Sequence, residues 1–364
     1  MKTNFSAGGL ILAAVLYTAQ AGAANFSSVY AFGDSLTDSG KSTSSVWSIY
    51  NFLNGYPGPI NPNGKCDSFH TCPPYYDGRY SNGKAAVELL ANGVLAGGST
   101  AGNFFNFAVS GATTGIGNYG DDGSQAQPGN RYAPLPPLPG IAQQIGFFQS
   151  YYSQSASPNA LYFLWGGAND YLTDVYIPLA TNPSLNPNNV AQTAAQTAAT
   201  NVANYAAALA SFGAQSILVP NLPDLGLTPF VTARGSNVIN PAHEYSVIFN
   251  QTLSALLAGV DAQFANTDVI KFDTFGFFNT IVANPAAFGF SDAVSACVVA
   301  GVACANPGAH VFWDDFHPTA LMHALVADAM VSQVPVPGAV WLFVSGLIVV
   351  FYRKNYRICS RQGC

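Results

Sequence analysis

Three side chains in this sequence could act together as a nucleophile, a base and a carboxylate that orients the base. Ser35 follows a short apolar segment, within residues 33–36 (Gly-Asp-Ser-Leu), where a turn could present its hydroxyl outward. A hydroxyl is a weak nucleophile until a base accepts its proton. Of the five histidines, we select His317, because Asp314 precedes it by three residues and can accept its Nδ1 proton, leaving Nε2 free to face Ser35. These residues predict a Ser35–His317–Asp314 triad.

Two further residues could stabilise the negative charge that develops when a serine attacks a carbonyl carbon. Gly111 follows a second apolar segment, and without a side chain its backbone N–H can approach a substrate oxygen. Asn169 follows a third apolar segment, and its side-chain amide is another suitable donor. Taken alone, each residue is better explained by a strand-ending turn. Because both follow successive predicted strands, we expect them to form an oxyanion hole.

Positioning these residues together requires a sheet, and the sequence predicts one. Short apolar segments alternate with helical stretches, which is typical of a parallel α/β sheet. The expected strands are 28–32, 104–109, 161–165, 216–220 and 269–272. The expected helices are 189–212, capped by Gly213, then 242–264, and a last helix from Pro318 to about Val331. The long loops 51–80 and 115–140 are expected to form the walls of a substrate pocket.

The segments that contain these residues resemble, in the same order, the conserved blocks of the GDSL (SGNH) hydrolase family. The likeness spans about Val29 to Val331, although Ser110 stands where many members have a second glycine. It implies a three-layer α/β/α flavodoxin-like fold with a five-stranded parallel sheet. The resemblance matches Ser35 to the nucleophile and first oxyanion donor, Gly111 and Asn169 to the other donors, and Asp314 and His317 to the Asp-x-x-His block.

The implied reaction is ester hydrolysis through an acyl-enzyme, with neither a cofactor nor a metal ion. We therefore expect a carboxylic-ester hydrolase that acts on a small-molecule or lipid ester. It would be an esterase or a lipase, and a phospholipase is one form that such an enzyme could take. An acetylesterase acting on surface polysaccharide is the alternative within the same fold. A non-catalytic surface-binding protein is the alternative from another class. Asp121 and Asp122 could bind calcium, although they fall short of an EF-hand pattern.

Charge separates the body of the chain from its ends. All 18 acidic residues lie between Asp34 and Asp328, together with only seven of the 12 basic residues, which gives this stretch a net charge of −11. Such a body is repelled by phosphate backbones, so we expect no nucleic-acid partner.

Both ends of the chain resemble export signals. Residues 1–24 resemble a signal peptide, which leaves a hydrolase domain over 25–333. Residues 334–364 contain Val-Pro-Val-Pro, an uncharged apolar stretch and a basic end, and they resemble a PEP-CTERM sorting signal in which Val336 replaces the usual Glu. This resemblance implies processing by an exosortase-type enzyme, and a permanent C-terminal membrane helix is the alternative. We expect the protein in the periplasm, at the outer surface or outside the cell.

Four of the six cysteines form two close pairs within loops. We expect disulfides between Cys66 and Cys72 and between Cys297 and Cys304, because an oxidising compartment lets such pairs close. Zinc ligation is less suited to this spacing. The tail cysteines, Cys359 and Cys364, are expected to pair with nothing in the body.

Overall fold

The structure, a computed structural model, describes residues 26–335. The predicted signal peptide and nearly all of the predicted C-terminal signal, including Cys359 and Cys364, lie outside this range. Among residues 26–335, no helix is both long enough and apolar enough to cross a membrane.

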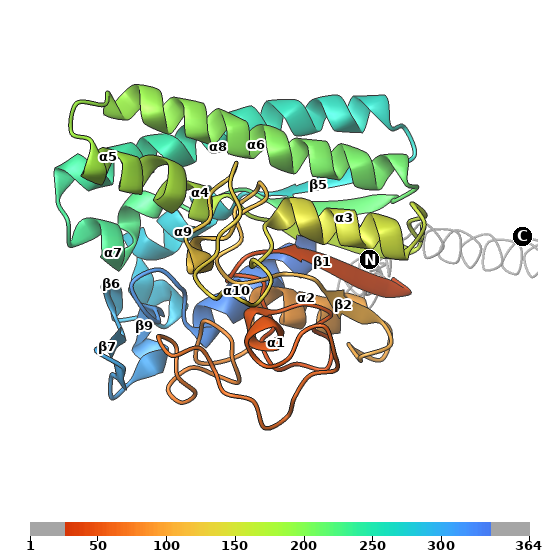
Figure 1. The fold of residues 1–364 in the computed structure, drawn as a ribbon, viewed down its shortest axis with the longest axis horizontal. Helices are drawn as coiled ribbons and strands as arrows, with labels where there is room; N and C mark the ends of the chain where they lie inside the picture. Colours follow the sequence, from red (N-terminus) through yellow and green to blue (C-terminus); the bar gives the residue numbers. More distant parts are fainter. Residues whose placement is uncertain (1–25, 336–364) are drawn as a thin grey trace, which may run out of the picture. The chain divides into compact units, whose positions relative to one another are not determined.

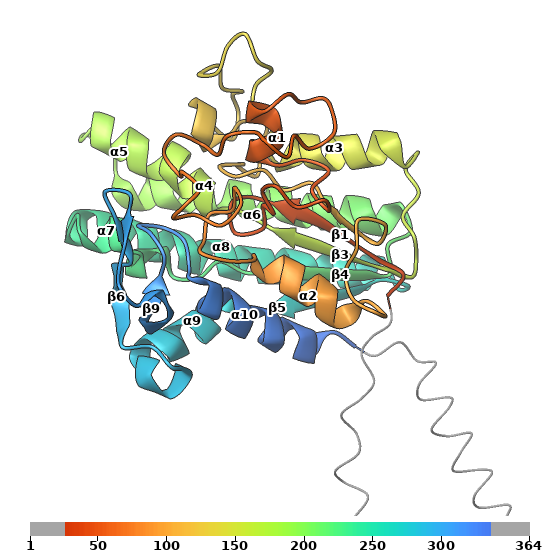
Figure 2. The same ribbon diagram turned by 90° about the horizontal axis from the view of Figure 1, so that it is seen from below.

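Five parallel strands form the central sheet, in the order β2-β1-β3-β4-β5 (Figures 1 and 2). They are β1 (Ser28–Gly33), β2 (Phe104–Asn106), β3 (Ala160–Trp165), β4 (Ser216–Pro220) and β5 (Asp268–Phe272). This is the flavodoxin-like strand order, so the predicted fold is confirmed. The register of β1 with β3 runs from Ser28 opposite Ala160 to Gly33 opposite Trp165, so the two strands end at the same level.

Helices cover both faces of the sheet and complete three layers (Figures 1 and 2). One face carries α3 (Ile141–Tyr151), α6 (Pro187–Ser211) and α8 (Ser236–Gln263), and the other carries α2 (Ala86–Val94) and α10 (Ala320–Gln333). The remaining α-helices are α1 (Ile49–Leu53), α4 (Ala168–Tyr171), α5 (Ile177–Thr181), α7 (Pro229–Thr232) and α9 (Thr274–Ala283). A π-helical turn, Leu172–Tyr176, joins α4 to α5.

The core between the sheet and α3, α6 and α8 combines large and small side chains. Tyr30 and Tyr162 stack with their ring centroids 5.3 Å apart, and Phe148 meets the edge of Tyr30 at 5.4 Å. Eight of the ten buried residues of α6 are alanine, which lets this helix approach the sheet and α8 closely. Helix α6 begins after its cap, Asn186, whose side chain accepts a hydrogen bond from the Asn189 N–H, and it ends before the predicted Gly213.

Several predicted boundaries differ from the structure. The helix predicted over 242–264 is α8, which begins six residues earlier, at Ser236, and contains Pro241. Two other differences have a local cause. The regular part of β2 ends at Asn106 rather than at residue 109, because the Asn106 side chain turns to donate to the Thr37 carbonyl at 2.6 Å. Gly111 therefore lies in a turn, five residues beyond the strand. The last helix begins at Ala320 rather than Pro318, because Pro318 pairs with Phe312 in an antiparallel bridge.

Four short strands before α10 were not predicted. Strand β6 (Asp292–Ala296) pairs with β9 (His310–Phe312), and β7 (Val298–Val299) forms a hairpin with β8 (Val302–Ala303). Strand β9 leads directly into the loop that contains Asp314 and His317, so this small sheet supports the C-terminal part of the site.

We predict that the buried ion pair between Arg79 and Glu88 of α2 is important for stability. Two Arg79 nitrogens donate to the two Glu88 carboxylate oxygens at 2.7 Å, and both side chains are 6% exposed. Glu88→Gln should lower the free energy of unfolding by about 3–5 kcal/mol, because it leaves a buried charge unpaired. Denaturant unfolding measures this change.

The matched control for this prediction is Asp122→Asn. Asp122 pairs with Arg131 at 3.3 Å, but these side chains are 62% and 46% exposed. The loss should stay within about 1 kcal/mol. Equal losses in the two variants would contradict the importance of burial.

Candidate active site

Ser35 lies in a tight turn directly after β1. The Asp34 carbonyl accepts hydrogen bonds from the N–H groups of Thr37 and Asp38, and the Asp34 carboxylate accepts one from the Leu36 N–H. These bonds fix the turn and leave the Ser35 side chain free to face outward. Its Oγ lies 2.8 Å from Nε2 of His317. The structure therefore brings together a hydroxyl and a base that are 282 residues apart in the sequence.

Asp314 and His317 form a closed loop between β9 and α10. One Asp314 oxygen accepts the N–H groups of Phe316 and His317, both at 2.8 Å, and Nδ1 of His317 lies 2.8 Å from both carboxylate oxygens. The Trp313 N–H donates to the His317 carbonyl at 2.7 Å and closes the turn. The Asp-x-x-His spacing thus places both side chains on one side of a single turn.

The Asp314 carboxylate stays ionised although it is buried. Burial would raise its pKa, but the charge of His317 and the hydrogen bonds from this loop lower the pKa of Asp314 to about 2. An ionised Asp314 requires that Nδ1 of His317 carries a proton, so Nε2 in the neutral ring is the acceptor. This is the protonation state in which His317 can take a proton from Ser35.

The Gly111 peptide has one fixed orientation. The Asn118 side chain donates to the Ser110 carbonyl at 2.9 Å, and because a trans peptide directs its N–H opposite to its carbonyl, the Gly111 N–H points away from Asn118. Gly111 has a φ of +81°, and a Cβ there would collide with the Asn118 side chain, so glycine is required. Among residues 26–335, neither the Gly111 N–H nor the Ser35 N–H donates to a protein acceptor.

Asn169 lies in the first turn of α4, four residues beyond β3. Its Nδ2 donates to the Ala112 carbonyl at 3.1 Å and to the Asp34 carboxylate at 3.2 Å. Burial raises the pKa of Asp34 to about 6. The amide has two N–H donors and both are engaged here, so one must leave its protein acceptor before Asn169 can donate to an oxyanion. Asn169 lines the same cavity as Ser35 and Gly111, so the three predicted oxyanion donors lie around one space.

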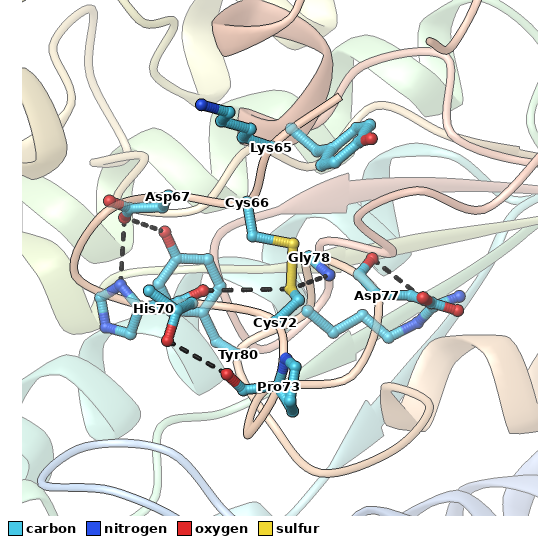
Figure 3. The surroundings of a disulfide bond; sticks show 12 residues. Lys65, Cys66, Asp67, His70, Cys72, Pro73, Asp77, Gly78 and Tyr80 are labelled. Atoms are coloured by element: carbon cyan, nitrogen blue, oxygen red, sulfur yellow. Dashed lines mark hydrogen bonds and ion pairs between the residues drawn. A yellow bond between two sulfur atoms is a disulfide. The ribbon is translucent and has the colours of Figure 1, made fainter. Parts of the chain in front are cut away.

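A second Asp-x-x-His segment, which was not singled out from the sequence although its spacing is visible there, lies beside the first. Nδ1 of His70 lies 3.0 Å from the Asp67 carboxylate, and the Tyr80 hydroxyl donates to the same oxygen at 3.1 Å (Figure 3). The His70 ring lies 6.3 Å from the His317 ring. Of these two histidines, only His317 is hydrogen-bonded to Ser35. The fold, and not the spacing, distinguishes the two segments.

A cavity of about 400 Å³ opens beside Ser35. Its walls include residues from both predicted pocket loops, among them Phe69 and His70 from loop 51–80 and Arg131 and Tyr132 from loop 115–140. The lining also includes apolar and aromatic side chains, namely Leu172, Leu225, Phe230, Val231, Phe278 and Phe316. This size is typical of sites for small molecules, and most of the lining is suited to an acyl chain.

Both predicted disulfides are present, Cys66–Cys72 and Cys297–Cys304. These four cysteines are therefore unavailable as zinc ligands. Asp122 pairs with Arg131, and Asp121 accepts the Leu138 N–H at 2.7 Å. Within residues 26–335, no three His, Cys, Asp or Glu side chains gather as they would around a metal ion.

Residues 29–330 match the family described as GDSL-like Lipase/Acylhydrolase. The chain belongs to this family. It is an ester-hydrolysing serine hydrolase, as predicted, because the family comprises lipases and acylhydrolases and the match covers most of the chain.

Individual relatives of known name have only low sequence identity to this chain. The phosphatidylcholine-sterol acyltransferase of Aeromonas hydrophila is 28% identical over 352 residues, which cover 83% of this chain and 88% of that protein. The GDSL esterase/lipase At1g29670 of Arabidopsis thaliana is 24% identical over 336 residues, or 82% of this chain and 85% of that protein. The lipase Lip_vut3 from a goat rumen metagenome aligns in structure at a TM-score of 0.41, with 13% identity over 85% of this chain and 99% of that chain, a likeness too weak for any conclusion.

We predict that Asp170, the neighbour of Asn169, makes stability depend on pH. Its buried carboxyl accepts the Thr114 hydroxyl at 2.6 Å, and burial raises its pKa to about 8. Between about pH 4 and 8 the folded state keeps a proton that the unfolded state has lost. The free energy of unfolding should therefore fall as pH rises, by roughly 1.4 kcal/mol for each unit by which the pKa is raised.

Urea unfolding at intervals between pH 4 and 8 measures this dependence. In Asp170→Asn the fall should be shallower than in the wild type, because the titrating group is gone. An unchanged slope would show that Asp170 does not carry the effect.

Proposed function

We propose that the chain hydrolyses lipid acyl esters, with Ser35 as the nucleophile, His317 as the general base and Asp314 as the carboxylate that orients His317. The observation that carries this proposal is the 2.8 Å contact between the Ser35 Oγ and the His317 Nε2 beside a largely apolar cavity. The contact has the length at which a base can remove the hydroxyl proton.

The reaction follows from this geometry in two halves. His317 accepts the Ser35 proton through Nε2 while the serine oxygen attacks the ester carbonyl carbon. The N–H groups of Ser35 and Gly111 and the Asn169 amide stabilise the oxyanion. His317 then protonates the departing alcohol, which leaves an acyl-enzyme. In the second half, His317 activates a water molecule, which attacks the acyl carbon, and Ser35 is released with its proton restored.

The lining of the cavity supports a lipid substrate. Phe230 and Phe316 pack with their ring centroids 4.5 Å apart and present an apolar wall next to the triad. Burying a methylene group there is favourable by about 0.8 kcal/mol, so a longer acyl chain should bind more tightly. The similarity to a relative named for phosphatidylcholine and sterol supports the same class of substrate.

A series of esters tests this function. The purified protein should hydrolyse p-nitrophenyl palmitate and butyrate with a higher kcat/KM than the acetate, by up to about fourfold for each buried methylene group. Ser35→Ala should lower kcat by at least about 10⁴-fold. Acetylated xylan is the comparison substrate. A preference for it would replace the lipid substrate with surface polysaccharide, and hydrolysis that does not depend on Ser35 would contradict the assigned nucleophile.

We further propose that the protein is exported and then processed by an exosortase-type enzyme. The two disulfides support export, because such bonds persist in oxidising compartments. Cell fractionation with mass spectrometry of the mature ends measures this. We expect protein outside the inner membrane that has lost residues 1–24 and the C-terminal segment. A mature chain that keeps its C-terminus in the membrane would indicate the anchor instead, and an intact cytoplasmic chain would contradict export.

A further inference from the structure

Segment 66–80, which begins with a disulfide-closed loop, is hydrogen-bonded to the proposed triad through one side chain. The Tyr75 hydroxyl donates to Oδ2 of Asp314 at 2.8 Å, across 239 residues of sequence. Tyr75 and Asp314 are 6% and 7% exposed, so water has little access to this bond. The contact was not predicted from the sequence, because nothing in the local pattern around Tyr75 relates it to Asp314.

The Tyr75 hydroxyl complements the other donors to Asp314. Oδ1 accepts two backbone N–H groups of the Asp-x-x-His turn, whereas Oδ2 has, apart from Tyr75, only the shared Nδ1 of His317. Without the hydroxyl, a buried charged oxygen would lose its second donor, and the carboxylate could rotate about its side-chain bonds. Burial and the nearby Asp314 charge raise the pKa of Tyr75 well above its usual range, so the hydroxyl remains a donor.

Tyr75 is held in place from several directions. Its N–H donates to the Thr71 carbonyl at 3.1 Å, just after the Cys66–Cys72 disulfide. Its ring meets the edge of Trp313 at 6.0 Å, one residue before Asp314, and packs in a cluster with Cys297 and Val298 of the second disulfide-closed segment. These contacts fix the position of the hydroxyl as well as that of the ring. A ring that only filled space would not need its hydroxyl to be fixed in this way.

We propose that Tyr75 is a positioning residue of the triad, whose hydroxyl fixes the Asp314 carboxylate in the orientation that presents His317 to Ser35. The proposal rests on the function proposed above. Tyr75 acts through Asp314 and has no contact of its own with the reacting atoms.

The variant Tyr75→Phe tests this role in the full-length protein, because it keeps the ring and its packing. We expect kcat/KM to fall by about tenfold to a hundredfold, which is the usual effect of losing a hydrogen bond to a charged group. The loss should lie in kcat with KM nearly unchanged. The low-pH limb of the kcat/KM profile should move to higher pH, because an Asp314 charge that is no longer shared with Tyr75 favours protonated His317.

Tyr50→Phe is the matched control. The Tyr50 hydroxyl also makes a 2.8 Å bond, to the Asn61 carbonyl, and is not hydrogen-bonded to Ser35, Asp314 or His317. Other ionisable groups near the Asp314–His317 pair are kept in both variants, namely Asp34, Asp67, His70, Tyr80, Asp315 and His323. A difference between the two variants therefore reports on Tyr75 alone.

A measurement without substrate separates this proposal from the proposed function. The low-field proton resonance of the His317 Nδ1–H should shift in Tyr75→Phe and stay in place in Tyr50→Phe. If the wild type hydrolyses no ester, the proposed function fails, while the resonance still tests the contact. The role of Tyr75 is overturned if Tyr75→Phe keeps the wild-type resonance and rates, or if Tyr50→Phe shows the same losses.

Discussion

The parallel register of β1 with β3 is the constraint on which the site depends. Because Gly33 lies opposite Trp165, the chain leaves both strands at the same level, and the turns that follow carry Ser35 and Asn169 to one edge. Hydrogen bonds from Phe107 and Val109 to β1 extend this alignment to the segment that ends at Gly111. The loop that contains His317 reaches the same edge of the sheet and completes the site.

The buried charge of Asp314 explains much of what surrounds that loop. An ionised carboxylate away from water is stable only when several donors surround it, and here they come from its own turn, from His317 and from Tyr75. The donor from Tyr75 requires that a distant segment is held beside β9. Both disulfides close segments that pack around Tyr75 and Trp313, so they stabilise the part of the site that the sheet does not build.

Sequence alone was sufficient for features that rest on local patterns. The five strands are apolar runs, the turn of Asp314 and His317 is set by its spacing, and the cysteine pairs are close in sequence. It was insufficient for contacts between distant segments, such as Asn118 with the peptide before Gly111, or Tyr75 with Asp314. The two Asp-x-x-His segments show the limit most clearly. They have the same spacing, and only the tertiary structure places His317 rather than His70 against Ser35.

Buried polar side chains around the proposed oxyanion hole set its geometry before any substrate binds. Asn118 orients the Gly111 peptide, and the Asp38 carboxylate accepts the Ser110 N–H at 2.8 Å one residue earlier. Asp170 accepts the Thr114 hydroxyl and ties the turn after Gly111 to α4. Orienting these groups is unfavourable in free energy. The burial of the hydrophobic core offsets this cost during folding. The N–H groups of Ser35 and Gly111 consequently need little reorganisation when charge develops on the substrate, which is the condition under which hydrogen bonds lower a barrier most.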